Sequence, residues 1–151
     1  MDAIDKRILR ELQKNGKVTN VELASRVNLS PTPCLERVKK LENRGIIQGY
    51  HAKLDADLLG LGLVVFVQII LNRTTTDIFD KFATRVKKLP EVLECHMVAG
   101  GFDYLLKLRF QDMIQYRRFH GEQLANMEGV LQTHTYIVME QIKETTSLGV
   151  K

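Results

Sequence analysis

Cationic side chains between residues 37 and 44 recur at a spacing that would place them on one face of a helix. Arg37, Lys40 and Arg44 stand at positions i, i+3 and i+7, and side chains at this spacing lie above one another on an α-helix. Such a row suits double-stranded DNA, because Lys neutralises phosphates and Arg can bind guanine through two hydrogen bonds. The same row is typical of an ordinary solvated helix face, so the surrounding elements must decide between the two interpretations.

Three short helices are predicted in this part of the chain. Residues 3–15 carry apolar side chains at helical spacing. Thr19 and Glu22 have the spacing of a capping box, which starts a second helix. Ser30-Pro31 opens the third, because Ser is a preferred cap and Pro is tolerated at the first helical position. Gly45 is expected to end it.

A tight turn at Asn28-Leu29-Ser30 joins the second and third helices, which is the plan of a helix-turn-helix. In that plan the third helix enters the major groove with its first residues toward the bases. We expect Leu35, Val38 and Leu41 to face inward, and residues 46–54 to form a short hairpin or wing. The residues expected to contact DNA are Ser30, Thr32, Pro33, Cys34, Arg37, Lys40 and Arg44.

The distribution of charge supports this interpretation. Residues 1–54 hold 11 Lys or Arg and 6 Asp or Glu, a net charge of +5, whereas residues 55–151 have a net charge of −1. A basic segment beside a neutral one is the footprint expected of a nucleic-acid contact. We therefore predict a DNA-binding domain over 1–54, a linker over 55–60 and a second domain over 61–151.

The second domain has the pattern of a doubled β-α-β unit. Apolar runs and alternation predict four strands, and helical spacing predicts two helices between them. The strands are expected at 61–71, 92–99, 102–110 and 130–139, and the helices start at Thr76-Asp77 and at Asp112. The predicted fold class is α+β: a winged helix-turn-helix domain followed by a ferredoxin-like βαββαβ domain, an antiparallel sheet with helices on one face.

One face of that sheet is left uncovered. The first strand is apolar on both sides, and we expect Phe102, Tyr104 and Leu106 to add apolar surface to the open face. A large uncovered apolar face implies a partner, and a second copy related by a two-fold axis is the simplest one. A dimer would also present two DNA-reading helices to two half-sites.

Three separated segments of the chain resemble one known family. They are Ser30–Val38 with Gly45–Tyr50, Glu94–Lys107, and Thr135–Glu140. In type and order they are similar to the Lrp/AsnC family, the feast/famine transcription regulators of bacteria and archaea, over essentially the whole chain. The resemblance implies dimers formed through the second domain, further assembly often into an octamer, and an amino-acid effector bound in clefts between dimers.

The resemblance also implies where an effector binds. Mapped onto this chain, the site comprises Gly100, Gly101, Phe102, Asp103, Tyr104, Met113, Tyr136, Ile137 and Val138. Asp103 would accept from the effector's ammonium group, and the glycine backbone can approach a ligand closely. An apolar lining favours leucine or methionine. Relatives often carry an acidic residue at the position of Gly101, so this chain has one carboxylate fewer. Without the resemblance, Gly100-Gly101 would be interpreted as an ordinary β-turn with no ligand.

Enzymatic chemistry has little support. None of His51, His96, His120 and His134 has a partner at metal-ligand spacing. Cys95 and His96 are neighbours in one predicted strand, so their side chains point to opposite faces. We expect no catalytic, metal or cofactor site. Two alternatives stay open: an amino-acid-sensing module acting on a protein partner, and a small dimeric ferredoxin-like enzyme. The basic helix-turn-helix argues against the enzyme. The sensing module is distinguished by replacing Arg37 and Lys40 with Ala, which should weaken binding to a promoter fragment only if the third helix contacts DNA.

Composition indicates where the protein acts. No window is apolar for 18 consecutive residues, and a charged segment follows Met1 directly, so we expect neither a membrane span nor a signal peptide. Two cysteines form no disulfide framework, which favours a reducing cytoplasm. The hypothesis is a cytoplasmic, nucleoid-associated transcription regulator that binds promoter DNA and responds to leucine or methionine.

Overall fold

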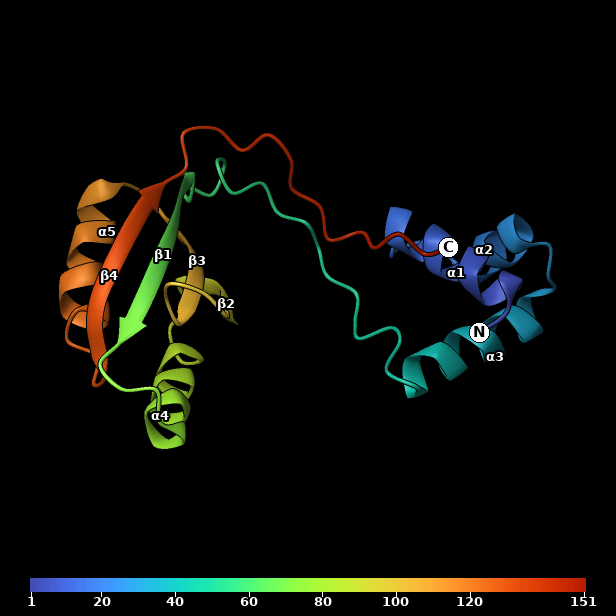
Figure 1. The fold of residues 1–151 in the computed structure, drawn as a ribbon. Coiled ribbons are helices and arrows are strands. Elements are labelled where there is room, and N and C mark those ends of the chain that lie inside the picture. The colour runs from blue at the N-terminus through green and yellow to red at the C-terminus, as the bar shows by residue number, and fades with distance from the viewer. The chain divides into compact units, whose positions relative to one another are not determined.

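The computed structural model describes residues 1–151 and divides them into two compact units (Figure 1). The first comprises Met1–Lys53 together with Lys143–Lys151, and the second comprises Leu54–Ile142. The last nine residues therefore pack with the helical unit, whereas sequence reasoning placed them in the second domain. The expected linker at 55–60 is a compact turn, in which the Leu61 backbone N–H donates to the Ala56 carbonyl at 2.7 Å.

Three helices form the first unit: α1 (Ala3–Lys14), α2 (Asn20–Val27) and α3 (Pro31–Asn43). Both of the first two begin with a capping box, at Asp2 and at Thr19. The Thr19 box was predicted and the Asp2 box was not. Between α2 and α3, Asn28 has φ 59°, a left-handed conformation that Asn tolerates better than most residues and that turns the chain sharply.

The buried stripe of α3 differs from the predicted one by one position. Cys34, Val38 and Leu41 face the helical core, whereas Leu35 is 41% exposed. Positions 34, 38 and 41 have the i, i+4, i+7 spacing of one helix face, and a shift of one residue rotates a side chain about 100° around the axis. Ser30 is the N-cap residue, but its side chain makes no capping hydrogen bond.

No hairpin forms over residues 46–54, so the expectation of a strand-built wing there is wrong. Two of its residues, Ile47 and Tyr50, instead contact the helices. The hydroxyl of Tyr50 donates to Glu42 at 2.9 Å, and its ring lies beside Gly16, where an added Cβ would approach it to 3.3 Å. Burial, together with the bond to the Glu42 carboxylate, raises the pKa of Tyr50 to about 12.

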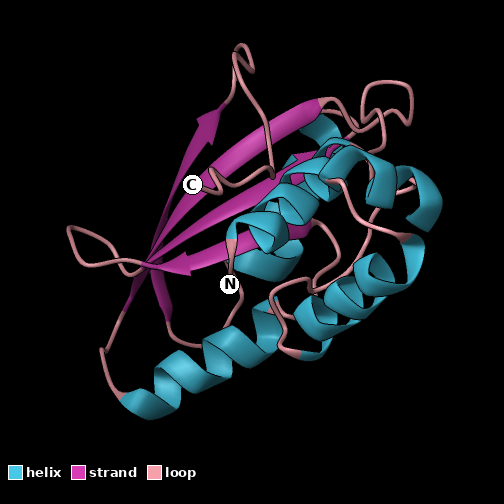
Figure 2. Ribbon diagram, turned by 90° about the vertical axis from the view of Figure 1, so that its right-hand side faces the viewer, coloured by secondary structure: helices cyan, strands magenta, loops and turns pink.

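The second unit has the predicted β-α-β-β-α-β order, with one irregularity. The elements are β1 (Leu63–Leu71), α4 (Thr76–Val86), β2 (Val92–Met97), β3 (Tyr104–Phe110), α5 (Met113–Phe119), the π-helical turn η1 (His120–Leu124) and β4 (Val130–Ile137). The strands form one antiparallel sheet in the order β2-β3-β1-β4. Figure 2 shows the strands in magenta and the helices in cyan. None of the helices is long and apolar enough to cross a membrane.

Strand alternation decides which side chains lie under the helices. On β1 and β3 every second residue is buried in one apolar core with α4 and α5. Tyr104 and Leu106 belong to this face, with Tyr104 at 4.5 Å from Phe82 between ring centroids. The expectation that they line the open face is therefore wrong. The open face instead carries the alternate residues, among them Phe66 and Leu105.

The C-terminal segment is fastened to α1. The side-chain amide of Gln13 donates to the carbonyl of Leu148 at 3.0 Å and accepts from its N–H at 2.6 Å. Val150 packs against the helical core. The one side-chain amide thus pairs with both backbone hydrogen-bonding groups of Leu148, as the backbone of a neighbouring strand would.

Ending the chain after Ser147 is therefore expected to destabilise the helical unit by about 1 kcal/mol, since two hydrogen bonds and the Val150 contact are lost. Thermal unfolding should show a fall in Tm of roughly 4–8 °C for a unit of this size. Gln13→Ala should reproduce part of the loss, and removal of Lys151 alone should change nothing. An unchanged Tm after truncation would contradict a stabilising role for the segment.

Candidate functional site

The turn between α2 and α3 is held at both ends. The side-chain amide of Asn20, at the start of α2, donates to the carbonyl of Pro31 at 2.8 Å. The Leu29 backbone N–H donates to the Ala24 carbonyl at 2.9 Å. These bonds fix the angle at which α3 leaves α2, which is the feature that a helix-turn-helix needs in order to present one helix to DNA.

Most of the predicted DNA-contacting residues lie on the surface. Five of them are exposed at the start or along the outer side of α3: Ser30, Thr32, Pro33, Lys40 and Arg44. Neither Lys40 nor Arg44 has an ion pair within 4 Å, so both positive charges are available to a phosphate.

Cys34 does not fit the prediction. Its side chain is completely buried between α3 and the rest of the helical core, and burial raises the pKa of its thiol. The buried stripe passes through position 34 and leaves position 35 outside. Cys34 is therefore a core residue and is removed from the interface.

The Arg37 side chain forms ion pairs with two carboxylates at the start of α1. Its Nη1 donates to the carboxylates of Asp2 and Asp5 at 2.7 Å each, and its side chain is 33% exposed. The bond from the Asp5 N–H, with the nearby Arg37 guanidinium, lowers the pKa of Asp2. A lowered folded-state pKa means that this contribution to stability is present above about pH 4 and is lost on acidification below it. Sequence reasoning missed these partners.

The predicted effector residues fall into two groups. Gly100–Tyr104 lie at the Leu71 end of β1, because the Asp103 carboxylate accepts from the Leu71 N–H. Tyr136–Val138 lie near the other end, where the Val138 N–H donates to Val64. Along β1 the separation ranges from three residue steps between Phe66 and Ile69, about 10 Å, to seven steps between Val64 and Leu71, about 23 Å. The two groups also belong to β3 and β4, which lie on opposite sides of β1. One chain therefore does not bring the two groups together.

Met113 belongs to the second group. It lines a shallow pocket of about 480 Å³ between α5 and β4. Two of its lining residues bond to β4: the Tyr116 hydroxyl forms a hydrogen bond with Thr135, and His120 forms one with Thr133 at 2.7 Å. Tyr136 points to the opposite face of β4, where its hydroxyl donates to Gln68 at 3.3 Å. The second group thus spans both faces of an edge strand.

Asp103 anchors the loop between β2 and β3. Its carboxylate accepts from the Leu71 N–H at 2.7 Å, and its own N–H donates to the Ile69 carbonyl at 2.9 Å. Gly100 and Gly101 are exposed, and a Cβ at either would meet no atom of this chain within 4 Å. The loop backbone is therefore open to an outside group. Tyr104 is only 4% exposed and packs in the core, so its ring does not border the loop surface.

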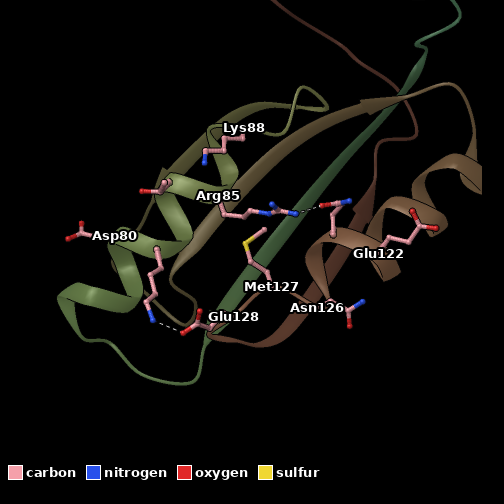
Figure 3. Close-up of a pocket in the computed structure, with 10 residues that line it drawn as sticks. Asp80, Arg85, Lys88, Glu122, Asn126, Met127 and Glu128 are labelled. Atoms are coloured by element: carbon pink, nitrogen blue, oxygen red, sulfur yellow. Dashed lines mark hydrogen bonds and ion pairs between the residues drawn. The ribbon is translucent and has the colours of Figure 1, made fainter.

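A second hollow lies between α4 and the 122–128 segment (Figure 3). It measures about 570 Å³, and its lining carries both signs of charge. Ion pairing and hydrogen bonding cross it: Lys81 contacts Glu128 at 2.6 Å, and Arg85 donates to Gln123 at 2.9 Å. No sequence motif pointed to these residues, whose contacts link elements more than 35 positions apart.

The structure contains no group of three or more His, Cys, Asp or Glu side chains that could hold a metal ion. His96 forms an ion pair with Glu94 at 3.1 Å when protonated, and Lys107 contacts the same carboxylate. These three residues lie on the open face of the sheet.

Comparison with known proteins identifies the class. Residues 1–48 match a winged helix-turn-helix DNA-binding family, and residues 64–148 match the Lrp/AsnC ligand-binding domain. The chain belongs to the Lrp/AsnC family of transcription regulators. It is 54% identical to the leucine-responsive regulatory protein of Escherichia coli K12 over 151 residues, which is all of this chain and 92% of that protein.

Solved structures agree with the fold. A transcriptional regulator of Neisseria meningitidis, crystallised in complex with L-Met, has a TM-score of 0.94 and 43% identity, covering 99% of this chain and 96% of that one. Escherichia coli AsnC has a TM-score of 0.89 and 25% identity, covering 97% of each chain. The predicted fold class is confirmed.

The predicted function is confirmed in its main terms. The chain is a DNA-binding transcription regulator with the ligand-binding domain of the Lrp/AsnC family, which is a family of regulators and not of enzymes. This sets aside the alternative of a small ferredoxin-like enzyme. The other alternative, a sensing module that acts only on a protein partner, is set aside because the same chain contains a DNA-binding domain.

Replacing Asp103 tests its anchoring role. Asp103→Ala removes the acceptor for the Leu71 N–H, and a buried donor left unpaired costs about 1–3 kcal/mol. Urea unfolding of the full chain should show this loss, whereas Asp103→Asn, which keeps an acceptor oxygen, should lose less. Equal stability of the alanine variant and the parent would show that the bond contributes nothing.

Proposed function

We propose that this protein binds promoter DNA through α3 and responds to leucine or methionine bound where two copies meet. The observation that carries the second part is the separation of the two groups of predicted effector residues. The Gly100–Asp103 loop and Tyr136–Val138 lie about 10–23 Å apart along β1, and they belong to strands on opposite sides of β1. We infer that one amino acid does not touch both groups of the same chain. A site that uses both requires a loop from one copy and a strand end from another.

The Gly100–Asp103 loop has the chemistry for the polar end of an amino acid. Its two glycines leave the backbone open, so N–H groups can donate to a carboxylate. Asp103 uses one carboxylate oxygen on Leu71, and the other has capacity for an ammonium group. The methionine complex of the Neisseria relative supports a small apolar amino acid as the effector. Ile137, Val138 and Met113 would line the part that receives its side chain.

The open face of the sheet supports a dimer. Phe66 and Leu105 are only partly covered within one chain, and Tyr136 is 51% exposed. Apolar side chains flanked by polar ones suit a two-fold contact with a second copy. Contacts between dimers would then complete the effector sites, in an assembly as large as an octamer. A regulator of this kind acts in the cytoplasm, on the nucleoid.

The DNA-contacting residues in this proposal are Ser30, Thr32, Pro33, Lys40 and Arg44. The first three stand at the N-terminal end of α3, which a helix-turn-helix directs toward base edges. Lys40 and Arg44 lie further along, exposed and without ion pairs, and are assigned to phosphates.

Substitution of Lys40 tests this interface. Lys40→Ala should weaken binding to a DNA duplex and lower the slope of log affinity against log salt concentration by about one, because one phosphate contact is lost. Fluorescence anisotropy over a series of salt concentrations measures both quantities. Lys17→Ala, which removes an equally exposed charge outside α3, is the matched control and should leave the slope unchanged. An unchanged slope for Lys40→Ala would reject the assignment.

A thermal-shift screen tests the effector. At 100 times its dissociation constant, an amino acid that binds only the folded state should stabilise it by about 2.7 kcal/mol. L-leucine or L-methionine should therefore raise the Tm, and their D-enantiomers serve as controls. The shift should depend on assembly, so light scattering under the same conditions reports whether it coincides with association of chains. Absence of any shift with both L-amino acids would contradict the proposed effectors.

A further inference from the structure

The guanidinium of Arg37 closes a hydrogen-bond network at the start of α1. Its Nη1 donates to Asp2 Oδ2 and to Asp5 Oδ1, at 2.7 Å each. The other two carboxylate oxygens form the capping box: Asp2 Oδ1 accepts from the Asp5 N–H at 2.8 Å, and Asp5 Oδ2 accepts from the Asp2 N–H at 3.1 Å. All four carboxylate oxygens are therefore occupied, and one nitrogen of α3 joins both ends of the box.

The charge of this network disfavours contact with a phosphate. One guanidinium and two carboxylates sum to a net charge of −1, and the Asp2 side chain is 52% exposed. A phosphate that approached Arg37 would meet this uncompensated carboxylate charge at short range. Lys40 and Arg44, in contrast, carry positive charge with no carboxylate within ion-pair distance. Arg37 therefore differs from Lys40 and Arg44 in that its positive charge is neutralised by carboxylates of the same chain.

The position of Arg37 gives it a mechanical role. It stands in the middle of α3, between Cys34 and Leu41 of the buried stripe, and its partners stand at the first turn of α1. Hydrogen bonds between ionised partners are shorter and roughly twice as strong as neutral ones, and here one nitrogen of α3 bonds to two carboxylates of α1. The two bonds therefore resist rotation of α3 about its own axis, a motion that would swing Thr32 and Lys40 away from the groove.

We propose that Arg37 is a positioning residue for DNA binding: together with Asp2 and Asp5 it sets the orientation of the recognition helix and makes no phosphate contact. This inference rests on the DNA interface proposed above for α3. It assigns two acidic residues of α1 a favourable role in binding a polyanion, which is the opposite of their direct electrostatic effect.

That opposition gives a sharp test with the full-length protein and a fluorescent mixed-sequence DNA duplex. If only charge mattered, Asp2→Asn/Asp5→Asn would bind DNA more tightly, because two negative charges are removed. The positioning role instead predicts weaker binding, by about threefold or more, with an unchanged salt slope. Glu36→Gln is the matched control, since Glu36 is an exposed carboxylate of α3 with no ion pair, and it should bind DNA as tightly as the parent or more tightly.

Arg37→Gln tests the third member of the network. It should weaken binding without lowering the salt slope, whereas Lys40→Ala lowers the slope by about one. Combining Arg37→Gln with the two Asp→Asn changes should cost no more than Arg37→Gln alone, because the three residues act as one unit. Circular dichroism confirms folding at the assay temperature, and Asp2→Asn alone, at the exposed carboxylate, serves if the multiple variant unfolds.

Two results would overturn the inference. A salt slope lowered by about one in Arg37→Gln would make Arg37 a phosphate contact. Equal or tighter DNA binding by the Asp→Asn variants would show that the network has no positioning role. If Lys40→Ala also leaves the slope unchanged, the fault lies in the α3 interface itself, so the two failures are distinguishable.

Discussion

The pairing of β1 with β3 on one side and β4 on the other is the constraint on which the ligand-binding unit depends. Once Val67 pairs with Leu106 and with Thr135, the period of two along each strand decides which side chains are buried under the helices. A slip of one residue would expose Tyr104 and bury Leu105. The same pairing places the β2–β3 loop at one end of the sheet and the end of β4 near the other.

Much of this architecture was predictable, because its signals are local. The capping box at Thr19, the Pro at the start of α3 and the strict alternation of β3 depend on residues within a few positions of one another. Family resemblance then supplied the function, and it is the basis of the proposed effector site. The π-helical turn at 120–124 was not predicted, since its apolar residues keep a spacing that also fits an uninterrupted helix.

What escaped prediction depends on contacts between distant parts of the chain. Arg37 meets carboxylates more than 30 positions away, so its spacing with Lys40 could not distinguish a DNA contact from an internal ion pair. Cys34 and Leu35 are both apolar neighbours, and only the packing of α3 against the other helices shows which one is buried. Tyr104 was assigned to the wrong face, because alternation identifies two faces without telling which of them the helices cover.

The two hydrogen bonds between Gln13 and Leu148 affect when the DNA-binding unit can be completed during synthesis. The DNA-binding unit contains both Met1–Lys53 and Lys143–Lys151, so in the order of the chain the ligand-binding unit is an insertion within it. During synthesis the three helices leave the ribosome before the ligand-binding unit, and they lack the packing element Lys143–Lys151 until that unit has been made. The finished DNA-binding unit thus exists only in chains that already contain the ligand-binding unit.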